Sequence, residues 1–368
     1  MHLSLLQSLA SGLTAFPLLG AASKPGPTIY HIPSTPQNGT AQAQLISSAS
    51  GFDAPKATPI TNSSFDWWYF DVASNNPADL ASITIVFFTT TQQGFPFTES
   101  SSATPVRISG TYSNGTLWDL TLDGDGSGAT VVVDGEATSG NWSSGVTWHA
   151  TSTSNYLITL DTPRLKGAIT FQSVAPAHLP CGADAPGQNL EVGPRIGWAN
   201  AIPDANSSVR LNITGTVLAF DGLGYHDKNW SDLPFTTNVA SWYWGHARVG
   251  PLSIVWFDFL DLEGNESVSV YVSRNNTIVT ASCSPGSIQV RPTGSTEQAA
   301  YPPVVSNPDP AGYRIEIVGG LALNISVLVP AVPTNPFYTR SIGTISTMVD
   351  GKFYSGRALF EQFKLVQS

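Results

Sequence analysis

Short runs of β-branched and aromatic residues recur along this chain from about residue 62 to its end, and no long amphipathic helical period interrupts them. Clusters of Gly, Asn, Asp and Ser, as at 113–115 and 123–126, separate the runs. Runs bounded by such turn residues are typical of strands, whereas an amphipathic helix needs apolar residues three and four positions apart. The chain is therefore predicted to be all-β, with antiparallel sandwiches or barrels.

We divide the sequence into four parts. Residues 1–23 are expected to be a signal peptide, and 24–60, rich in Pro, Ser, Thr and Gly, an irregular N-terminal arm. Two β domains follow, at 61–190 and 191–368, because the segment 176–194 is rich in Pro, Gly and Ala and marks a boundary. We expect the two domains to pack together. Brief helix is expected only near 185–200 and 356–363.

The N-terminus predicts entry into the secretory pathway. Residues 3–19 are mostly apolar and uncharged, and the small residues at 20–23 are suitable for cleavage. A membrane anchor is the alternative, but polar residues and Pro17 break a stretch that is barely long enough to span a bilayer. We therefore expect no stable membrane anchor, and a protein that is secreted or held in the lumen of a vesicle or vacuole.

Asn-x-Ser/Thr sequons support this expectation, because ten of them follow the signal-like start. Asn229 belongs to one that lies within a dense polar motif, and this sequon is expected to be unused if the motif lines a pocket. The nine predicted glycosylation sites are Asn38, Asn62, Asn114, Asn141, Asn206, Asn212, Asn265, Asn275 and Asn324.

Charge and cysteine content exclude several functions. The formal net charge is −10 and no basic run exists, so the chain lacks the electrostatic signature of nucleic-acid binding. Cys181 and Cys283 are the only cysteines and are expected to form one disulfide, with two buried free thiols as the alternative. Two cysteines and six scattered histidines do not make a structural zinc site, so we expect no metal.

The segment 65–71 is the first of three dense aromatic or polar motifs. Because side chains alternate along a strand, both faces of this segment are aromatic, and one face is expected to fill a core while the other lines a ligand cavity. A central strand of a sandwich core is the alternative. One face carries Phe65, Trp67, Tyr69 and Asp71, and the other carries Asp66, Trp68 and Phe70.

The segment 241–248 is the second motif, and its side chains are also expected to alternate between the two faces of a strand. It places two indoles, an imidazole and a guanidinium on one face of a strand, and a residue pair at 256–258 is expected to repeat the theme on the next strand. Such a wall is typical of a site for an apolar, partly oxygenated ligand; a core histidine is the alternative for His246. The residues of this wall are Trp242, Trp244, His246, Arg248, Trp256 and Asp258.

The segment 222–231 carries the densest polar cluster in a chain with only 11% charged residues. Tyr225, Asp227 and Asn229 share one parity, whereas His226, Lys228 and Trp230 share the other. An aspartate among aromatic rings is desolvated, which raises its pKa and keeps a proton available near neutral pH. Asp227 is therefore a candidate general acid, with a salt-linked turn as the structural alternative.

Other motifs of common enzymes are absent from the sequence. It contains no Gly-x-Ser-x-Gly nucleophile elbow, no His-Glu-x-x-His, no phosphate-binding loop and no dinucleotide fingerprint. A glycosidase needs two facing carboxylates, and Asp227, Asp258 and Asp261 leave that option open.

Four motifs resemble the carotenoid 1,2-hydratases (hydroxyneurosporene synthases) and, equally, the related Diels–Alderases of fungal natural-product pathways. The resemblance extends from about residue 60 to the C-terminus. The Tyr-x-Asp-x-Asn-Trp element is the most specific of them. The motifs are WWYFD at 67–71, GPRIGWAN at 193–200, GYHDKNW at 224–230 and GRALFE at 356–361.

The resemblance implies two lipocalin-like antiparallel β domains packed together, with a hydrophobic pocket at or near their junction and no metal or organic cofactor. It implies that Asp227 is the proton donor, supported by Tyr225 and by Trp230 or Trp242. His226 and His246 are further candidates for acid chemistry. An apolar polyketide or terpenoid is expected to bind against Trp67, Trp68, Tyr69, Trp230, Trp242, Trp244, Trp256 and Arg248.

We therefore expect a cofactor-free pericyclase of fungal secondary metabolism. A hetero-Diels–Alder coupling of a tropolone-type quinone methide with a terpene would use an acid twice, to expel water and to polarise the carbonyl. The alternatives are a hydratase or dehydratase of a terpenoid double bond, a decalin-forming Diels–Alderase acting on a polyketide, and a lipocalin-like carrier without catalysis.

Overall fold

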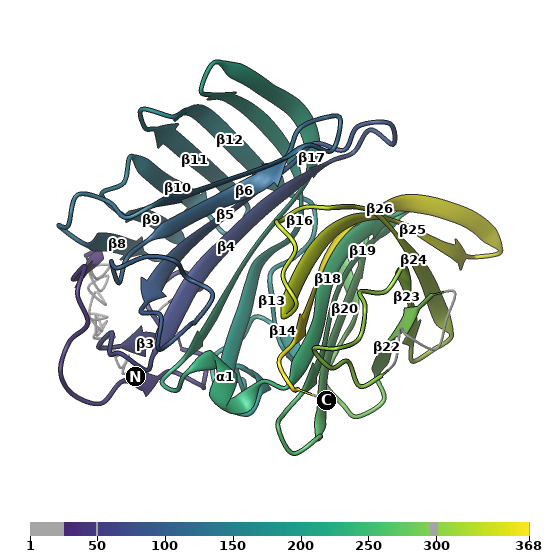
Figure 1. Cartoon of the computed structure of the whole chain (residues 1–368). Helices are drawn as coiled ribbons and strands as arrows, with labels where there is room; N and C mark the ends of the chain where they lie inside the picture. Colours follow the sequence, from purple (N-terminus) through teal and green to yellow (C-terminus); the bar gives the residue numbers. More distant parts are fainter. Residues whose placement is uncertain (1–25, 49–50, 295–300, 368) are drawn as a thin grey trace, which may run out of the picture.

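Nearly all regular structure in this protein is β-strand (Figure 1). The computed structural model describes residues 26–48, 51–294 and 301–367, so the predicted signal peptide lies outside the described residues. Within the described residues the one helix is the short α1 (Phe235–Asn238), and the segments near 185–200 and 356–363 are strands instead of helices. Two large antiparallel sheets confirm the prediction of an all-β fold.

The first sheet contains most strands of the N-terminal two thirds of the chain. In order of pairing, its strands are β1 (Thr28–Ile32), β8 (Ala129–Asp134), β9 (Ala137–Asn141), β10 (Val146–Ser152), β11 (Asn155–Asp161), β12 (Leu165–Ser173), β16 (Ile196–Ile213), β17 (Thr216–Ser231), β4 (Phe65–Ser74), β5 (Ser82–Thr90), β6 (Val106–Thr111) and β7 (Leu117–Leu122). Short strands attach to β16 directly or through a neighbour: β13 (His178–Leu179), β14 (Gly182–Ala183) and β15 (Glu191–Gly193).

The second sheet begins after α1 and runs to the C-terminus. Its strands, in order of pairing, are β21 (Thr277–Ser282), β20 (Glu266–Arg274), β19 (Leu252–Leu260), β18 (Ser241–Val249), β26 (Lys352–Lys364), β25 (Tyr338–Val349), β24 (Leu321–Pro330), β23 (Gly312–Ile317) and β22 (Ile288–Thr293). A separate pair consists of β2 (Gln42–Ala43) and β3 (Ala57–Thr58).

The observed sheets differ from the predicted division of the chain in two places. The long strands β16 and β17 pair with β12 and β4, so the first sheet continues to Ser231, beyond the expected boundary at 190. The 24–60 arm is also not wholly irregular, because β1 pairs with β8 at the edge of the first sheet. The Pro- and Gly-rich segment 176–194 is a connection within this half of the molecule.

Each sheet curls around a core of its own, and the two curled sheets lie side by side (Figure 1). A third cluster of buried aromatic residues, which includes Trp67 of β4 and Trp242 of β18, joins residues of both sheets. The burial of apolar side chains at this junction stabilises the contact between the two halves, by roughly 25 cal/mol for each Å² removed from water. The site described below lies in this third cluster.

The predicted disulfide is confirmed. Cys181, which follows β13, is bonded to Cys283, which follows β21, and their Cα atoms are 4.8 Å apart. The bond therefore ties the connection 176–194 to the outer edge of the second sheet. No helix among the described residues is long and apolar enough to cross a membrane.

Candidate active site

Strands β4 and β17 place the polar residues of the site side by side. In their antiparallel register Tyr69 is opposite Asp227, and Trp67 is opposite Asn229. Directly opposed side chains lie on the same face of a sheet. The odd-numbered residues of both motifs face the junction with the second sheet. The even-numbered residues face away from it, with Trp68 and Phe70 in the core of the first sheet and Trp230 in a smaller buried cluster. The alternation read from the sequence is therefore the alternation that builds the site.

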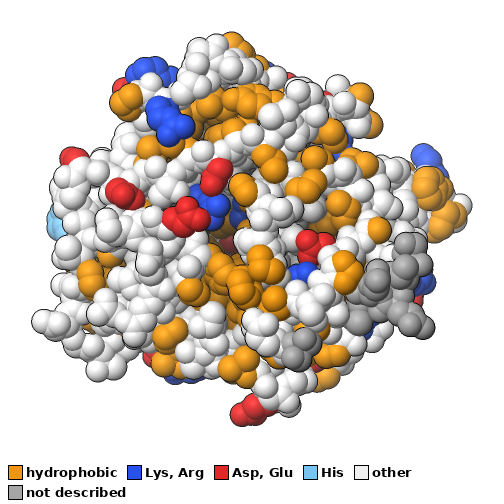
Figure 2. Space-filling model, viewed as in Figure 1, with side chains coloured by type: hydrophobic (Ala, Val, Ile, Leu, Met, Phe, Trp, Pro, Cys, Tyr) orange, Lys and Arg blue, Asp and Glu red, His pale blue; other side chains and the backbone are white. Residues whose placement is uncertain are grey.

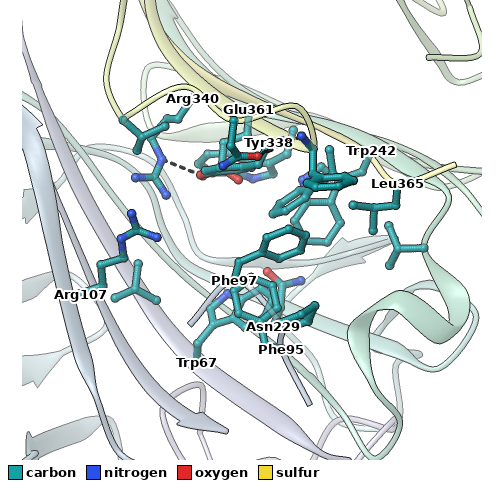
Figure 3. A pocket seen from close by; sticks show the side chains of 18 of the residues that line it. Trp67, Phe95, Phe97, Arg107, Asn229, Trp242, Tyr338, Arg340, Glu361 and Leu365 are labelled. Carbon is teal, nitrogen blue, oxygen red and sulfur yellow. Dashed lines mark hydrogen bonds and ion pairs between the residues drawn. The ribbon is translucent and has the colours of Figure 1, made fainter. Parts of the chain in front are cut away.

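A cavity of about 660 Å³ opens at this junction. Figure 2 shows a hollow near the centre of this face, with charged side chains on one side of it and hydrophobic ones on the other. Its aromatic walls come from both sheets and from the loop after β5, and they converge on the interior (Figure 3). The aromatic lining residues are Trp67, Tyr69, Phe88, Phe95, Phe97, Trp242, Trp244, Phe257, Phe337, Tyr338 and Phe363.

Asp227 and Glu361 are both buried carboxyl groups in the cavity wall, but among the described residues Asp227 lacks a cationic partner, whereas Glu361 is paired with Arg340. Its Oδ2 accepts hydrogen bonds from Trp198 Nε1 and Tyr225 Oη, both at 2.8 Å. Burial raises the pKa of the Asp227 carboxyl to about 8, although these two hydrogen bonds lower it. At neutral pH the carboxyl is therefore mostly protonated and can donate a proton into the cavity.

Tyr225 lies behind Asp227 and does not line the cavity itself. Burial raises the pKa of its phenol well above 10, and the nearby Asp227 raises it further, so the hydroxyl stays neutral and donates. The ring stacks on His246 at a centroid distance of 4.5 Å, and His246 Nε2 lies 2.9 Å from Oδ1 of the buried Asp71. Tyr225 and His246 thus support Asp227 from behind the cavity wall.

A second polar group also lines the cavity. Arg340 of β25 donates through Nε to Oε1 of Glu361 on β26, 2.8 Å away, and Tyr338 donates to the same oxygen at 2.8 Å. Burial raises the pKa of the Glu361 carboxyl, while Arg340 lowers it. Glu361 also contributes to the raised pKa of Asp227, although less than burial does. The two polar groups are therefore electrostatically linked.

Three predicted site residues of β4 and β17 lie on the face away from the cavity, contrary to the expectation that they line it. Trp68 packs in the core of the first sheet, and Trp230 donates to the carbonyl of Gln44. His226 stacks on Phe70 and lies 2.9 Å from Asp53 Oδ1. Strand alternation turns all three away from the junction. It does the same for the lysine at position 228, which forms a 2.6 Å ion pair with the aspartate at position 66.

Four residues of the predicted second wall fail to reach the cavity: His246, Arg248, Trp256 and Asp258. His246 lies behind the wall against Tyr225, and Asp258 is buried in an ion pair with Arg291 of β22. Arg248 is at the end of β18, where it binds Asp204 of the first sheet through Nη2 at 2.6 Å. Trp256 faces the core of the second sheet, where its ring covers Gly245, and Phe257 lines the cavity instead. The reason is register: Trp256 is opposite Gly245, whereas Phe257 is opposite the cavity residue Trp244. Trp242 and Trp244 do line the cavity, as expected.

Sequence reasoning missed several residues of the site. Trp198 belongs to the GPRIGWAN motif, but nothing in the sequence pairs it with Asp227. Glu361 belongs to the GRALFE motif, while Arg107 and Arg340 stand in ordinary strand segments without any signal. Within the described ranges, no group of three or more His, Cys, Asp or Glu side chains is arranged to hold a metal ion.

Comparisons with known proteins place this geometry in a family. A family model described as Diels–Alderase-like matches residues 24–318. The quinolone epoxide rearrangement protein penF of Penicillium thymicola is 36% identical over 340 residues, which is 89% of this chain and 92% of that protein. The quinolone epoxide rearrangement protein asqO of Emericella nidulans is 32% identical over 335 residues, with 89% and 91% covered.

A solved structure has a similar fold. The crystal structure of CghA with Sch210972 superposes with a TM-score of 0.72 at 16% identity, covering 94% of this chain and 100% of that one. The similarity in fold extends over both sheets.

Proposed function

Because this protein belongs to the Diels–Alderase-like family, we propose that it is a cyclase or isomerase of an apolar small molecule, with Asp227 as the general acid. The observation that carries the proposal is the neutral, buried carboxyl of Asp227 in the wall of an aromatic cavity. General acid catalysis is most effective when the pKa of the acid lies near the working pH. An acid of this kind activates a substrate oxygen by giving it a proton.

The relatives' epoxide chemistry fits this acid best. In our proposal Asp227 gives its proton to the epoxide oxygen as one C–O bond breaks, so that positive charge develops on carbon. A bond then migrates, or a double bond or oxygen of the same molecule attacks, and a proton returns to the carboxylate. Product and substrate have the same atoms, so the step is an isomerisation. The substrate is a quinolone-type or terpenoid epoxide of fungal secondary metabolism.

The aromatic walls support such a reaction in two ways. Indole and phenyl faces carry negative quadrupole potential, which favours a nearby carbocation. Trp67, Trp242 and Phe257 also limit the conformations of an apolar substrate and exclude water, which would otherwise trap the cation as a diol.

A cycloaddition is the second candidate, supported by the family and by the volume of the cavity. For a hetero-Diels–Alder coupling of a tropolone-type quinone methide with a terpene, Asp227 would first protonate the departing hydroxyl and then polarise the carbonyl. A shape-driven decalin-forming cyclisation of a polyketide would depend on the walls more than on the acid. A hydratase would instead add water to a terpenoid double bond, and a carrier would bind the same ligand without turnover.

The test combines an Asp227→Asn variant with isotope labelling. A prenyl-aryl epoxide is incubated with each protein in H₂¹⁸O, and the products are analysed by mass spectrometry. We expect an isomer without ¹⁸O, and a loss of turnover of roughly 10²–10⁴-fold in the variant. Incorporation of one ¹⁸O would indicate a hydratase, and unchanged turnover in the variant would refute the acid role. Binding without turnover by the wild type would indicate a carrier.

We further propose that the protein acts in the secretory pathway or is secreted, with a cleaved signal peptide and glycans on its surface sequons. All nine sequon asparagines predicted to be glycosylated are exposed, which is compatible with modification.

A further inference from the structure

Two arginines from different sheets lie on one side of the cavity. Arg107 is on β6 of the first sheet and Arg340 is on β25 of the second, and both side chains line the cavity. In Figure 3 their guanidinium groups point toward one another on the same side of the cavity. The proposed acid chemistry uses neither of them.

The guanidinium of Arg340 has more donors than protein partners. It is 7% exposed, and a guanidinium carries five N–H donors. Among the described residues its only hydrogen bonds run from Nε to Glu361 Oε1 at 2.8 Å and from Nη1 to Ser109 Oγ at 3.4 Å. Nη2 bonds to none of these residues, and Arg340 lines the cavity, so the remaining N–H groups are available to an acceptor that enters it.

Tyr69 adds a third donor beside them. Its hydroxyl is buried and has no hydrogen-bond partner among the described residues. The ring lies 5.2 Å from the guanidinium carbon of Arg340, measured to the ring centroid, and Tyr69 is directly opposite Asp227 in the strand register. Tyr69 is therefore a neighbour of both the general acid and Arg340.

The charges around Arg107 and Arg340 indicate which kind of ligand oxygen would bind there. Arg340 is paired with Glu361, and Arg107 forms a two-pronged pair with Asp119, at 3.3 Å from Nε and 3.0 Å from Nη2. Each cation thus has its own carboxylate, so the region offers hydrogen-bond donors without excess positive charge. Such a region suits a neutral carbonyl oxygen, which has two lone pairs, better than a carboxylate, which would add an unbalanced charge.

We propose that Arg340, Arg107 and Tyr69 form a binding site for a carbonyl oxygen of the substrate, adjacent to Asp227. This inference rests on the proposed function and narrows its substrate to a planar, apolar molecule with a conjugated ketone or lactam carbonyl beside its acid-sensitive group. The three donors hold the carbonyl and so present the reacting oxygen to Asp227.

Two rigid ligands that differ only in the carbonyl test the site. Equilibrium dialysis of the full chain measures the dissociation constants of 9-fluorenone, which has the carbonyl, and of fluorene, which has CH₂ in its place. A hydrogen bond to a charged donor predicts that fluorenone binds roughly tenfold more tightly. Fluorene-9-carboxylate is the anionic comparison, and it is expected to bind more weakly than fluorenone. Equal affinity for fluorenone and fluorene, or no binding of either, overturns the proposal, and so does preference for the carboxylate.

Tyr69→Phe is the most informative variant, because the hydroxyl that it removes bonds to no residue in the described part of the chain. It is expected to fold at least as stably as the wild type and to lose about threefold or more of the preference for fluorenone. Arg340→Lys keeps a cation beside Glu361 but loses the planar N–H donors of the guanidinium. The double variant Arg340→Lys/Arg107→Gln is expected to abolish the preference for fluorenone over fluorene. Arg210→Gln, an exposed arginine remote from the cavity, is the matched control and should change nothing. A preference that survives Tyr69→Phe and the double variant refutes the assignment.

The same ligands separate this inference from the proposed function. Asp227→Asn is expected to keep the fluorenone preference while losing turnover of the epoxide. If turnover is lost but the wild type shows no preference, the carbonyl site is refuted and the acid remains. If the preference holds but the Asp227→Asn variant turns over normally, the acid is refuted and the carbonyl site remains.

Discussion

Tyr225 donates a hydrogen bond to Oδ2 of Asp227 at 2.8 Å, although the two residues are only two positions apart on one strand. Alternation puts both side chains on the same face of β17, and Trp198 of the neighbouring strand donates to the same oxygen. Both donors favour the ionised carboxylate, but burial outweighs them and the pKa of Asp227 is about 8. The two hydrogen bonds therefore lower the pKa of Asp227 but leave its carboxyl mostly protonated at neutral pH.

The rate of the reaction is expected to fall as pH rises through about 8, because only protonated Asp227 can act as the acid. Below that value the rate should be flat, apart from effects of substrate ionisation. Tyr225→Phe removes a hydrogen bond that lowers the pKa of Asp227, so it should move the falling limb to higher pH. A profile of kcat against pH for both proteins measures this. A limb that moves to lower pH in the variant would contradict the assignment.

Stability is also expected to depend on the protonation of Asp227. The folded chain keeps this proton up to about pH 8, whereas an unfolded aspartate releases it near 3.8, so stability is lost as pH rises across that window. The slope is at most about 1.4 kcal/mol per pH unit. Asp227→Asn has no carboxyl at this position and so lacks this pH dependence. Because the wild type loses stability between pH 5 and pH 7.5, the unfolding free energy of the variant minus that of the wild type should increase over this range. Urea titrations at the two pH values measure the difference, and a constant difference would refute the raised pKa.

The ion pair between Lys228 and Asp66 is expected to be structural. Nζ of Lys228 lies 2.6 Å from Asp66 Oδ1 and 3.1 Å from the ring centroid of Trp68, and both charged residues are buried. Lys228→Met removes the ammonium beside this buried carboxylate, which keeps only the backbone N–H donors of Lys56 and Ala57, and should cost about 3–5 kcal/mol of unfolding free energy. Adding Asp66→Asn removes the uncompensated charge but keeps an oxygen for the backbone N–H groups of Lys56 and Ala57, so it should recover most of that loss, as a double-mutant cycle by urea denaturation would show. Equal losses in the single and double variants would contradict the pairing.

The disulfide is expected to stabilise the fold by constraining the unfolded chain. Cys181 and Cys283 are 102 residues apart, so their bond closes a long loop. Replacing both by Ser should lower the unfolding free energy by about 2–4 kcal/mol. Calorimetry of the wild type with and without reductant, beside the double variant, measures the loss. Reductant should not change the unfolding free energy of the double variant. If reductant lowers the stability of the variant as well, the effect of reductant on the wild type has a cause other than the disulfide.

Asn229 is expected to be the one sequon asparagine without a glycan when the protein is produced in a eukaryotic secretory host. It is 4% exposed, it lines the cavity, and its Nδ2 donates to the carbonyl of Gly197 at 3.2 Å. The other nine sequon asparagines lie on exposed positions. Glycosidase treatment in H₂¹⁸O followed by peptide mass spectrometry identifies the occupied sites. A glycan on Asn229 in the folded protein would be incompatible with its place in the cavity wall.

Strand alternation explains why much of the site could be read from the sequence. The motif at 65–71 and the motif at 222–231 each divide by parity, and the structure keeps both divisions: Tyr69 and Asp227 face the cavity, whereas Trp68 and His226 face a core. The period of two is a local property of the backbone, so it holds wherever the strand packs.

The sequence by itself therefore determined the all-β class, the disulfide candidates and the sets of side chains that share a face. It did not determine which of two buried faces is packed solid and which borders a cavity, because both are aromatic. That choice depends on pairing between distant strands, which sets Phe257 rather than Trp256 opposite Trp244. Pairing and packing also bring Arg340 of β25 against Ser109 of β6, 231 residues earlier in the chain. Only the tertiary structure places these side chains in one cavity with Asp227, because no short-range pattern in the chain connects them.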